Sequence, residues 1–298
     1  MRKYPKKNQF LLTFLLGLDL LSGCTATAVN IPTATPAPEP TPTIQPTSTS
    51  IPPANSGTLP ILKCTDSGVV KYFEIQSDAL KGKLAFNVYF PPCYGNGQQA
   101  SYPVIYLLHG QTYDQTQWVR LGAPHSADQL IQEGHTQPFL MIMPLEEFYF
   151  RPVENNEFPL ALIKDLLPWS EKNLNACNQP SCRAIGGISR GASWALHLAL
   201  QPPYLFGSVG GHSLPTFIED MQTLPVQLKK LPHDLALRLY LDIGRSDPEV
   251  KSAYNYEQIL NQQGVLHEWH LNEGHHDEEY WSAHISEYLG WYAQNWKK

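Results

Sequence analysis

The segment 187–191 reads G-I-S-R-G and could carry nucleophilic chemistry at Ser189. It matches the pattern G-x-S-x-G, in which a serine occupies a sharp turn between a strand and a helix. The flanking glycines leave room for the turn, and the start of the helix favours negative charge near the serine hydroxyl. Apolar segments at 184–188 and 192–200 predict the required strand and helix. The alternative is a glycine-rich turn with a surface serine.

A serine hydroxyl needs a general base, and the base needs an acid that orients it. In proteins with this turn, the acid and then the histidine follow the serine along the chain. Asp242 lies within a predicted strand at 237–243, whereas Asp247 lies in the loop after that strand. Because the acid has to reach the histidine from a loop, the position favours Asp247. Asp242 would then orient the loop at the strand end.

Two adjacent histidines, His275 and His276, are candidates for the base. They follow the last predicted strand, 265–271, and precede the closing helix, but their position alone does not separate them. The alternative is a metal site in this stretch of histidines and carboxylates. It is disfavoured because the spacing H-E-x-x-H is missing from the sequence. The sequence therefore predicts no metal and no cofactor.

Attack on an ester places negative charge on the carbonyl oxygen, which needs two N–H donors. The backbone N–H of Arg190, directly after the serine, is the first candidate. The loop after the apolar segment 104–108 begins with His109 and Gly110, and the N–H of Gln111 is the second candidate. His109 itself could instead pack at the strand end and hydrogen-bond the loop.

The elements that must position these residues alternate along the chain. Segments 69–76 and 83–90 predict an antiparallel hairpin. Further strands are predicted at 104–108, 139–143, 184–188, 237–243 and 265–271, and helices at 159–174, 192–200, 249–263 and 281–292. Strands that are apolar at consecutive positions suit a sheet buried on both faces. The pattern predicts an α/β fold with a doubly wound, mostly parallel sheet in one domain, residues 60–298.

The first 59 residues have a different character. Positive residues and a short apolar stretch, 10–21, predict a signal peptide over 1–23, because a membrane-spanning helix needs roughly 20 apolar residues. The stretch ends in L-S-G-C, which resembles the lipobox of bacterial lipoproteins and assigns the lipid to Cys24. An ordinary secretory signal is the alternative. Residues 24–59 are rich in threonine and proline and predict an extended tether. We expect an extracytoplasmic, lipid-anchored protein.

Four cysteines remain, and export permits disulfides. The register of the predicted hairpin places Cys64 near Cys93, and Cys177 and Cys182 would close a short loop. Four free thiols are the alternative, and the spacing disfavours a zinc site. The net charge of −6 disfavours nucleic acid as a partner, because such proteins usually carry a basic face.

Several motifs together resemble the esterase D / antigen 85 family of α/β-hydrolases. This family includes feruloyl esterases, S-formylglutathione hydrolase, enterochelin-type esterases and mycolyltransferases. The motifs are Y-L-L-H-G at 106–110, D-L-L-P at 165–168, G-G-I-S-R-G at 186–191 and G-H-H at 274–276. The resemblance covers nearly all of 65–298 and implies the α/β-hydrolase fold.

The resemblance also implies roles for particular residues. In the family the catalytic histidine commonly lies five residues before a tryptophan, which implies His276 before Trp281. The family acid lies three residues after a glycine, which implies Asp247. The second oxyanion donor follows the His-Gly pair, which implies Gln111. This sequence departs from the common family pattern at Arg190 and in the segment 211–213. Both departures bear on which substrate is bound and leave the mechanism unchanged.

We therefore expect a serine carboxylesterase that hydrolyses small or carbohydrate-linked esters, such as feruloyl or acetyl esters, through an acyl-enzyme. The alternatives are an extracytoplasmic acyltransferase like the mycolyltransferases and a non-catalytic binding lipoprotein. An intact Ser/Asp/His set argues against the binding lipoprotein, which need not keep it.

Substrate contacts are expected from three loops, 111–118, 146–158 and 214–224. The first two loops are rich in aromatic side chains, which suit an aromatic acyl group or a sugar face, although packing within the loops is the alternative. The predicted contact residues are His109, Trp118, Phe150, Arg190 and Trp281.

Overall fold

The computed structural model describes residues 66–97, 99–232 and 235–296. All of them belong to one compact unit, Leu59–Lys298. The predicted signal peptide, the lipid site at Cys24 and almost all of the tether precede this unit and lie outside the described residues. No helix in the described part of the chain is long and apolar enough to span a bilayer.

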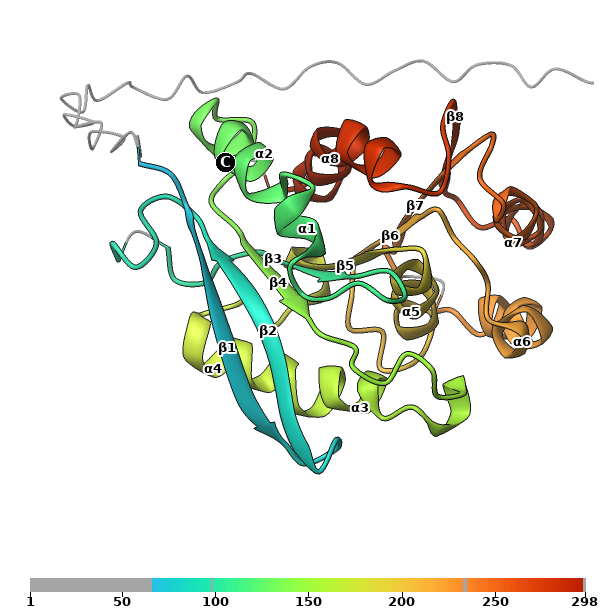
Figure 1. Ribbon diagram of the computed structural model, residues 1–298, viewed down its shortest axis with the longest axis horizontal. Helices are drawn as coiled ribbons and strands as arrows, with labels where there is room; N and C mark the ends of the chain where they lie inside the picture. Colours follow the sequence, from blue (N-terminus) through green and yellow to red (C-terminus); the bar gives the residue numbers. More distant parts are fainter. Residues whose placement is uncertain (1–65, 98, 233–234, 297–298) are drawn as a thin grey trace, which may run out of the picture. The chain divides into compact units, whose positions relative to one another are not determined.

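The described strands form a single sheet in the order β1-β2-β4-β3-β5-β6-β7-β8 (Figure 1). β1 pairs antiparallel with β2, and β2 with β4, while the other neighbours run parallel. The antiparallel start and the parallel remainder are as predicted. The strands are β1 (Val69–Ser77), β2 (Gly82–Phe90), β3 (Val104–Leu108), β4 (Leu140–Pro144), β5 (Arg183–Ile188), β6 (Ser208–His212), β7 (Arg238–Gly244) and β8 (Glu268–Asn272).

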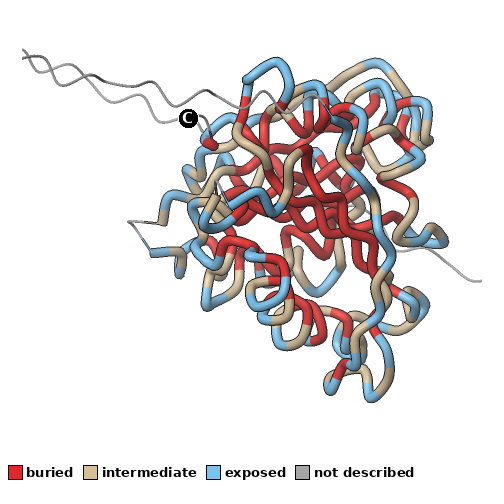
Figure 2. Tube along the Cα trace, turned by 90° about the vertical axis from the view of Figure 1, so that its left-hand side faces the viewer, coloured by how far each residue is buried: buried red, intermediate tan, exposed pale blue. Residues whose placement is uncertain are grey.

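Helices cover both faces of the sheet, which makes it doubly wound. Alternate strand residues belong to two different core clusters: Ile105 and Leu107 pack with α2 and α8, whereas Tyr106 and Leu108 pack with α4 and α5. Figure 2 shows the buried residues concentrated in the interior between these layers. The helices are α1 (Gln117–Arg120), α2 (Ala123–Gln132), α3 (Phe158–Ala161), α4 (Leu167–Leu174), α5 (Arg190–Ala199), α6 (Ile218–Lys229), α7 (Val250–Gln262) and α8 (Glu278–Ala293).

The helix predicted at 159–174 is confirmed, with a π-helical turn (Leu162–Leu166) between α3 and α4. Two other local features differ from the sequence pattern. Most of the loop predicted at 214–224 belongs to helix α6, which begins at Ile218. Strand β6 is missing from the strands that the local pattern predicts, because its sequence contains two consecutive glycines in place of an apolar run.

The glycines of β6 and β5 make room for a tyrosine from α8. A Cβ on Gly186 would lie 1.7 Å from the Tyr292 hydroxyl, and a Cβ on Gly210 would lie 1.9 Å from it. The hydroxyl is in turn hydrogen-bonded to His212 Nε2 at 3.0 Å. Helix α8 therefore packs directly against β5 and β6. This contact helps to fix the position of the N-terminal turn of α8, which begins at Glu278.

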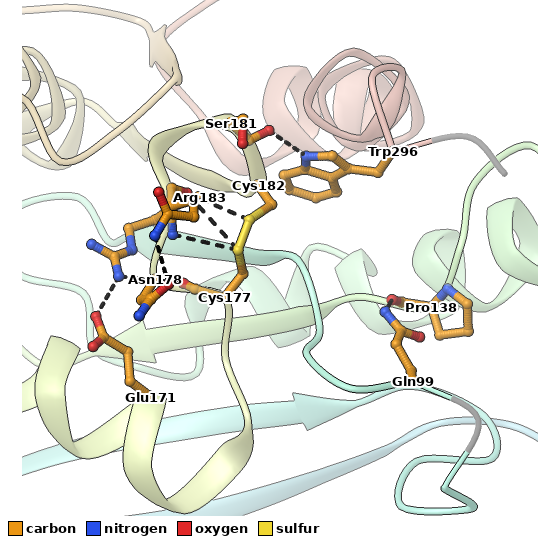
Figure 3. Close-up of a disulfide and its surroundings, with 10 residues drawn as sticks. Gln99, Pro138, Glu171, Cys177, Asn178, Ser181, Cys182, Arg183 and Trp296 are labelled. Carbon is orange, nitrogen blue, oxygen red and sulfur yellow. Dashed lines mark hydrogen bonds and ion pairs between the residues drawn. A yellow bond between two sulfur atoms is a disulfide. The ribbon is translucent and has the colours of Figure 1, made fainter.

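The predicted disulfide Cys177–Cys182 closes the loop between α4 and β5 (Figure 3). The loop is also held at Ser181, whose carbonyl accepts a hydrogen bond from Trp296 Nε1 at 3.2 Å. Directly after it, the buried Arg183 pairs with Glu171. These contacts fix the start of β5, the strand that ends directly before Ser189. The predicted Cys64–Cys93 pairing stays a prediction, because Cys64 lies outside the described residues.

Candidate active site

Ser189 occupies a strained turn between β5 and α5. Its φ of 54° lies in the left-handed region, which non-glycine residues seldom adopt. A Cβ on Gly187 would lie 2.2 Å from the Gly191 backbone, and a Cβ on Gly191 would lie 2.4 Å from the Leu108 carbonyl oxygen. Only glycine fits at either position, which explains the spacing of the motif. The turn is also held by Ser189 N–H, which donates to the His212 carbonyl at 2.8 Å.

The structure brings Ser189, His276 and Asp247 together in a continuous hydrogen-bonded set. The Ser189 hydroxyl lies 2.9 Å from His276 Nε2, and His276 Nδ1 lies 2.8 Å from Asp247 Oδ2. The second carboxylate oxygen of Asp247 accepts a hydrogen bond from Glu249 N–H at 2.8 Å. In this geometry Nδ1–H donates to the carboxylate, which leaves Nε2 free to accept the serine proton.

The two alternatives from the sequence lie elsewhere. His275 is exposed and faces a different hollow, together with Asp277 and His284. Asp242 is fully buried and bonded to His212 Nδ1 at 2.6 Å. It also accepts hydrogen bonds from the hydroxyls of Tyr280 and Tyr288, both at 2.7 Å. Neither residue contacts Ser189.

A pocket of about 330 Å³ opens at the serine. It is lined by Gly110, Gln111, Thr112, Tyr113, Ser189, His276 and Trp281. The N–H groups of Gln111 and Arg190 donate no hydrogen bond to any other described residue. Both are therefore available to a ligand oxygen, as expected for the predicted oxyanion donors.

Comparison with known proteins identifies the family of the chain. Residues 77–292 match the family model described as "Putative esterase". The chain belongs to this esterase family. A curated relative, the endo-1,4-beta-xylanase/feruloyl esterase of Xylanibacter ruminicola, is 28% identical over 240 residues, which cover 77% of this chain and 30% of the relative. Esterase Rv1288 of Mycobacterium tuberculosis is 29% identical over 153 residues, 48% of this chain and 32% of the relative.

The chain thus spans about a third of the length of these curated relatives. Among solved structures, a ferulic acid esterase has a TM-score of 0.69 at 20% identity and covers 77% of this chain and 100% of its own. S-formylglutathione hydrolase (FrmB) from Staphylococcus aureus has a TM-score of 0.61 at 15% identity, covering 76% and 98%. The predicted family and the α/β-hydrolase fold are confirmed.

Of the predicted substrate contacts, only Trp281 lines the Ser189 pocket. Its ring lies 5.2 Å from the His276 ring and 6.3 Å from the Tyr113 ring, edge to face in both cases. The indole N–H donates to Ser213 Oγ at 2.9 Å. Trp281 therefore forms a wall of the pocket and packs against the imidazole of His276.

Trp118 and His109 are corrected from substrate contacts to interior residues. Trp118 lies in the short helix α1, and its side chain points inward, where it is 1% exposed and donates to the Leu108 carbonyl at 3.0 Å. His109 is 3% exposed, and both ring nitrogens are occupied by backbone groups of Gly110 and Glu146. Neither side chain is within reach of a ligand in the pocket.

Arg190 and Phe150 also lie differently from what the sequence suggested. The Arg190 guanidinium is paired with Glu146 and packs against the rings of Trp194 and Phe217. Phe150 is 71% exposed and is not among the residues that line the Ser189 pocket. Its ring contacts are with neighbouring aromatics of its own loop.

The sequence pattern does not single out Glu146, although in the structure this residue contacts both His109 and Arg190. Its signal is weak: it is a carboxylate two residues after the buried strand β4, at the edge of the sheet where parallel strands end. Its partner Arg190 is 44 residues away in sequence, so only the folded chain reveals the pairing.

Proposed function

We propose that this protein is a serine carboxylesterase that works through an acyl-enzyme on Ser189. The observation that carries the proposal is the unbroken hydrogen-bonded set of Ser189, His276 and Asp247 beside a pocket that Ser189 and Gln111 line. Among the described residues, the N–H groups of Gln111 and Arg190 have no hydrogen-bond acceptor. A nucleophile, an oriented base and oxyanion donors in one place are what acyl transfer requires.

In this reaction, Ser189 Oγ attacks the ester carbonyl carbon while its proton passes to His276 Nε2. The N–H groups of Arg190 and Gln111 donate to the oxygen that becomes negative. The carbon–oxygen bond to the alcohol then breaks, and the alcohol leaves with the proton from His276. Water next gives a proton to His276 and attacks the acyl carbon, which releases the acid and returns the proton to Ser189. Asp247 holds the imidazole in the required tautomer throughout.

We further propose that the substrates are small or carbohydrate-linked esters, including feruloyl or acetyl esters. Two observations support this class. The relative from Xylanibacter ruminicola and a structural neighbour are named as feruloyl or ferulic acid esterases. In addition, the rings of Tyr113 and Trp281 line the pocket and suit an aromatic or sugar surface.

We also propose that the esterase works outside the cytoplasm, attached by lipid at Cys24 and held away from the membrane by residues 24–59. Support comes from the positive and apolar signal sequence and the L-S-G-C segment at its end. Each buried methylene of an acyl chain contributes about 0.8 kcal/mol, so several chains anchor firmly.

The proposal is tested with a panel of esters: p-nitrophenyl acetate, methyl ferulate and a feruloylated arabinose. We expect the wild type to hydrolyse them and Ser189→Ala to lose activity by at least about 10³-fold. Addition of a sugar or lipid alcohol separates hydrolysis from transfer. A rate that appears only with that acceptor would favour the acyltransferase, and a wild type inactive toward all esters would contradict the proposal.

A further inference from the structure

Glu146 lies buried between the two segments that supply the oxyanion donors. Its side chain is 4% exposed, and its carboxylate accepts hydrogen bonds from Arg190 Nη2 at 2.7 Å and from Arg190 Nε at 3.0 Å. This two-point geometry is stronger and more directional than a single ion pair. The guanidinium is further held against the faces of Trp194 and Phe217. The residue that carries the first oxyanion donor is thus fixed through its side chain.

The backbone of Glu146 reaches the second segment. Its N–H donates to His109 Nε2 at 2.8 Å, so this nitrogen carries no proton. The proton of the neutral ring is therefore on Nδ1, which donates to the Gly110 carbonyl at 2.8 Å. Burial lowers the pKa of His109, which is consistent with a neutral ring.

The Gly110 carbonyl determines the direction of the second donor. A peptide unit is planar and trans, so its C=O and N–H point in opposite directions. The N–H in the same unit as the Gly110 carbonyl is that of Gln111. The carbonyl also accepts from Tyr113 N–H at 3.1 Å, and Gly110 N–H donates to the Gln117 side chain at 2.8 Å. These bonds hold the Gln111 N–H in one orientation, opposite to the Gly110 carbonyl, in a residue that lines the pocket.

From these contacts we infer that Glu146 is a positioning residue that couples the two halves of the oxyanion hole. Its carboxylate holds Arg190, and its N–H holds, through His109, the peptide that carries the Gln111 N–H. This inference rests on the proposed function. Because the donors act on charge that appears only during the reaction, loss of the coupling should lower kcat and leave KM nearly unchanged.

The test compares kcat and KM for p-nitrophenyl acetate in the wild type, Glu146→Ala and Glu146→Gln. Loss of one oxyanion donor costs about 10²–10³ in kcat, and misalignment should cost less. We therefore expect kcat to fall about tenfold to a hundredfold in Glu146→Ala, with KM within about twofold. Glu146→Gln keeps the shape and one acceptor, so it should restore part of the rate and is the variant to use if Glu146→Ala does not fold.

Glu74→Ala is the matched control, because Glu74 also pairs with a basic residue, Lys83, but on the exposed hairpin. We expect it to keep wild-type constants. Wild-type kcat in both folded Glu146 variants, or a loss confined to KM, would overturn the inference while leaving the proposed function intact. A wild type without esterase activity would overturn both.

Discussion

Two aspartate–histidine pairs lie near the carboxyl edge of the sheet. His276 and Asp247 come from loops, and the imidazole is 23% exposed at the Ser189 pocket. His212 and Asp242 come from strands β6 and β7, and both are fully buried. The two pairs have the same chemical groups, but only His276 has a free nitrogen directed at a nucleophile, because His212 Nε2 is bonded to Tyr292. The two pairs therefore differ in the partner of the histidine Nε2, which is the Ser189 hydroxyl for His276 and the Tyr292 hydroxyl for His212.

The first prediction at this scale concerns the orienting acid. Asp247→Asn keeps the shape of the side chain, but its amide no longer fixes the reactive tautomer of His276. We expect kcat to fall by about 10⁴-fold with little change in the unfolding midpoint. Steady-state kinetics and a thermal melt provide the check. Retention of kcat within tenfold of the wild type would show that Asp247 is not the acid.

A second prediction concerns the buried His109. Burial lowers its pKa below the usual 6.5, and this effect exceeds the opposing ones from the hydrogen bond to Gly110 and the charge of Glu146. As the pH falls, His109 in the unfolded chain therefore binds a proton at a higher pH than His109 in the folded chain. The contribution of neutral His109 to stability is complete above pH 6.5 and decreases as the pH falls below it, by at most about 1.4 kcal/mol per pH unit.

Urea unfolding of the wild type and His109→Gln between pH 7.5 and 5.0 checks this expectation. The wild type should lose more unfolding free energy over that range than the variant, in which this proton site is missing. Equal losses in the two proteins would show that His109 does not contribute to the pH dependence.

At the scale of the elements, the contact between helix α8 and the sheet controls the position of His276. Tyr280, Tyr288 and Tyr292 of α8 all hydrogen-bond to the buried pair of His212 and Asp242. The loop with His276 leads directly into this helix, whose N-cap is Asp277, bonded to Tyr280 N–H at 2.9 Å. Precise docking of α8 is thus a condition for the hydrogen bond between His276 and Ser189.

The prediction at this scale concerns Gly210, which leaves room for the Tyr292 side chain of α8. In Gly210→Ala the added methyl group would collide with the Tyr292 side chain, and overpacking of this kind costs about 1–3 kcal/mol of unfolding free energy. Denaturant unfolding measures the loss. Combination with Tyr292→Leu should cost less than the sum of the two single changes, because the collision is removed.

Gly82→Ala is the control for this prediction, since its nearest neighbour would be 3.8 Å away. It should leave the unfolding free energy within about 0.5 kcal/mol of the wild type. Strict additivity in the double variant would show that the two residues do not collide.

Sequence patterns identify those elements whose signal is local. The turn at Ser189 could be predicted because its glycines and flanking apolar segments are adjacent in sequence. Strand β6 could not be predicted from its local pattern, because Gly210 is required by the contact with Tyr292, more than 80 positions later. The inward direction of Trp118 and the pairing of Glu146 with Arg190 likewise depend on tertiary contacts, which no local pattern encodes.

At the scale of the whole molecule, the proposed catalytic residues and the predicted lipid anchor lie in separate parts of the chain. The residues that line the Ser189 pocket all belong to the compact unit Leu59–Lys298. The proposed anchor site, Cys24, and the predicted tether precede this unit in the sequence. We therefore expect attachment and catalysis to be separable.

Cys24→Ala tests this separation. The wild type, expressed in a bacterium with a lipoprotein pathway, should incorporate labelled palmitate and sediment with membranes. The variant should do neither, while its kcat toward p-nitrophenyl acetate stays within about twofold of the wild type. A wild type that takes up no palmitate would contradict the lipid anchor, and an ordinary cleaved signal would then explain the leader.

The acyl-enzyme on Ser189 is the central claim, and mass spectrometry of the protein after reaction with a fluorophosphonate probe tests it most directly. We expect a single phosphonyl adduct on the peptide that contains Ser189, a parallel loss of ester hydrolysis, and no adduct in Ser189→Ala. An adduct on another residue, or hydrolysis that continues after Ser189 is fully modified, would contradict it.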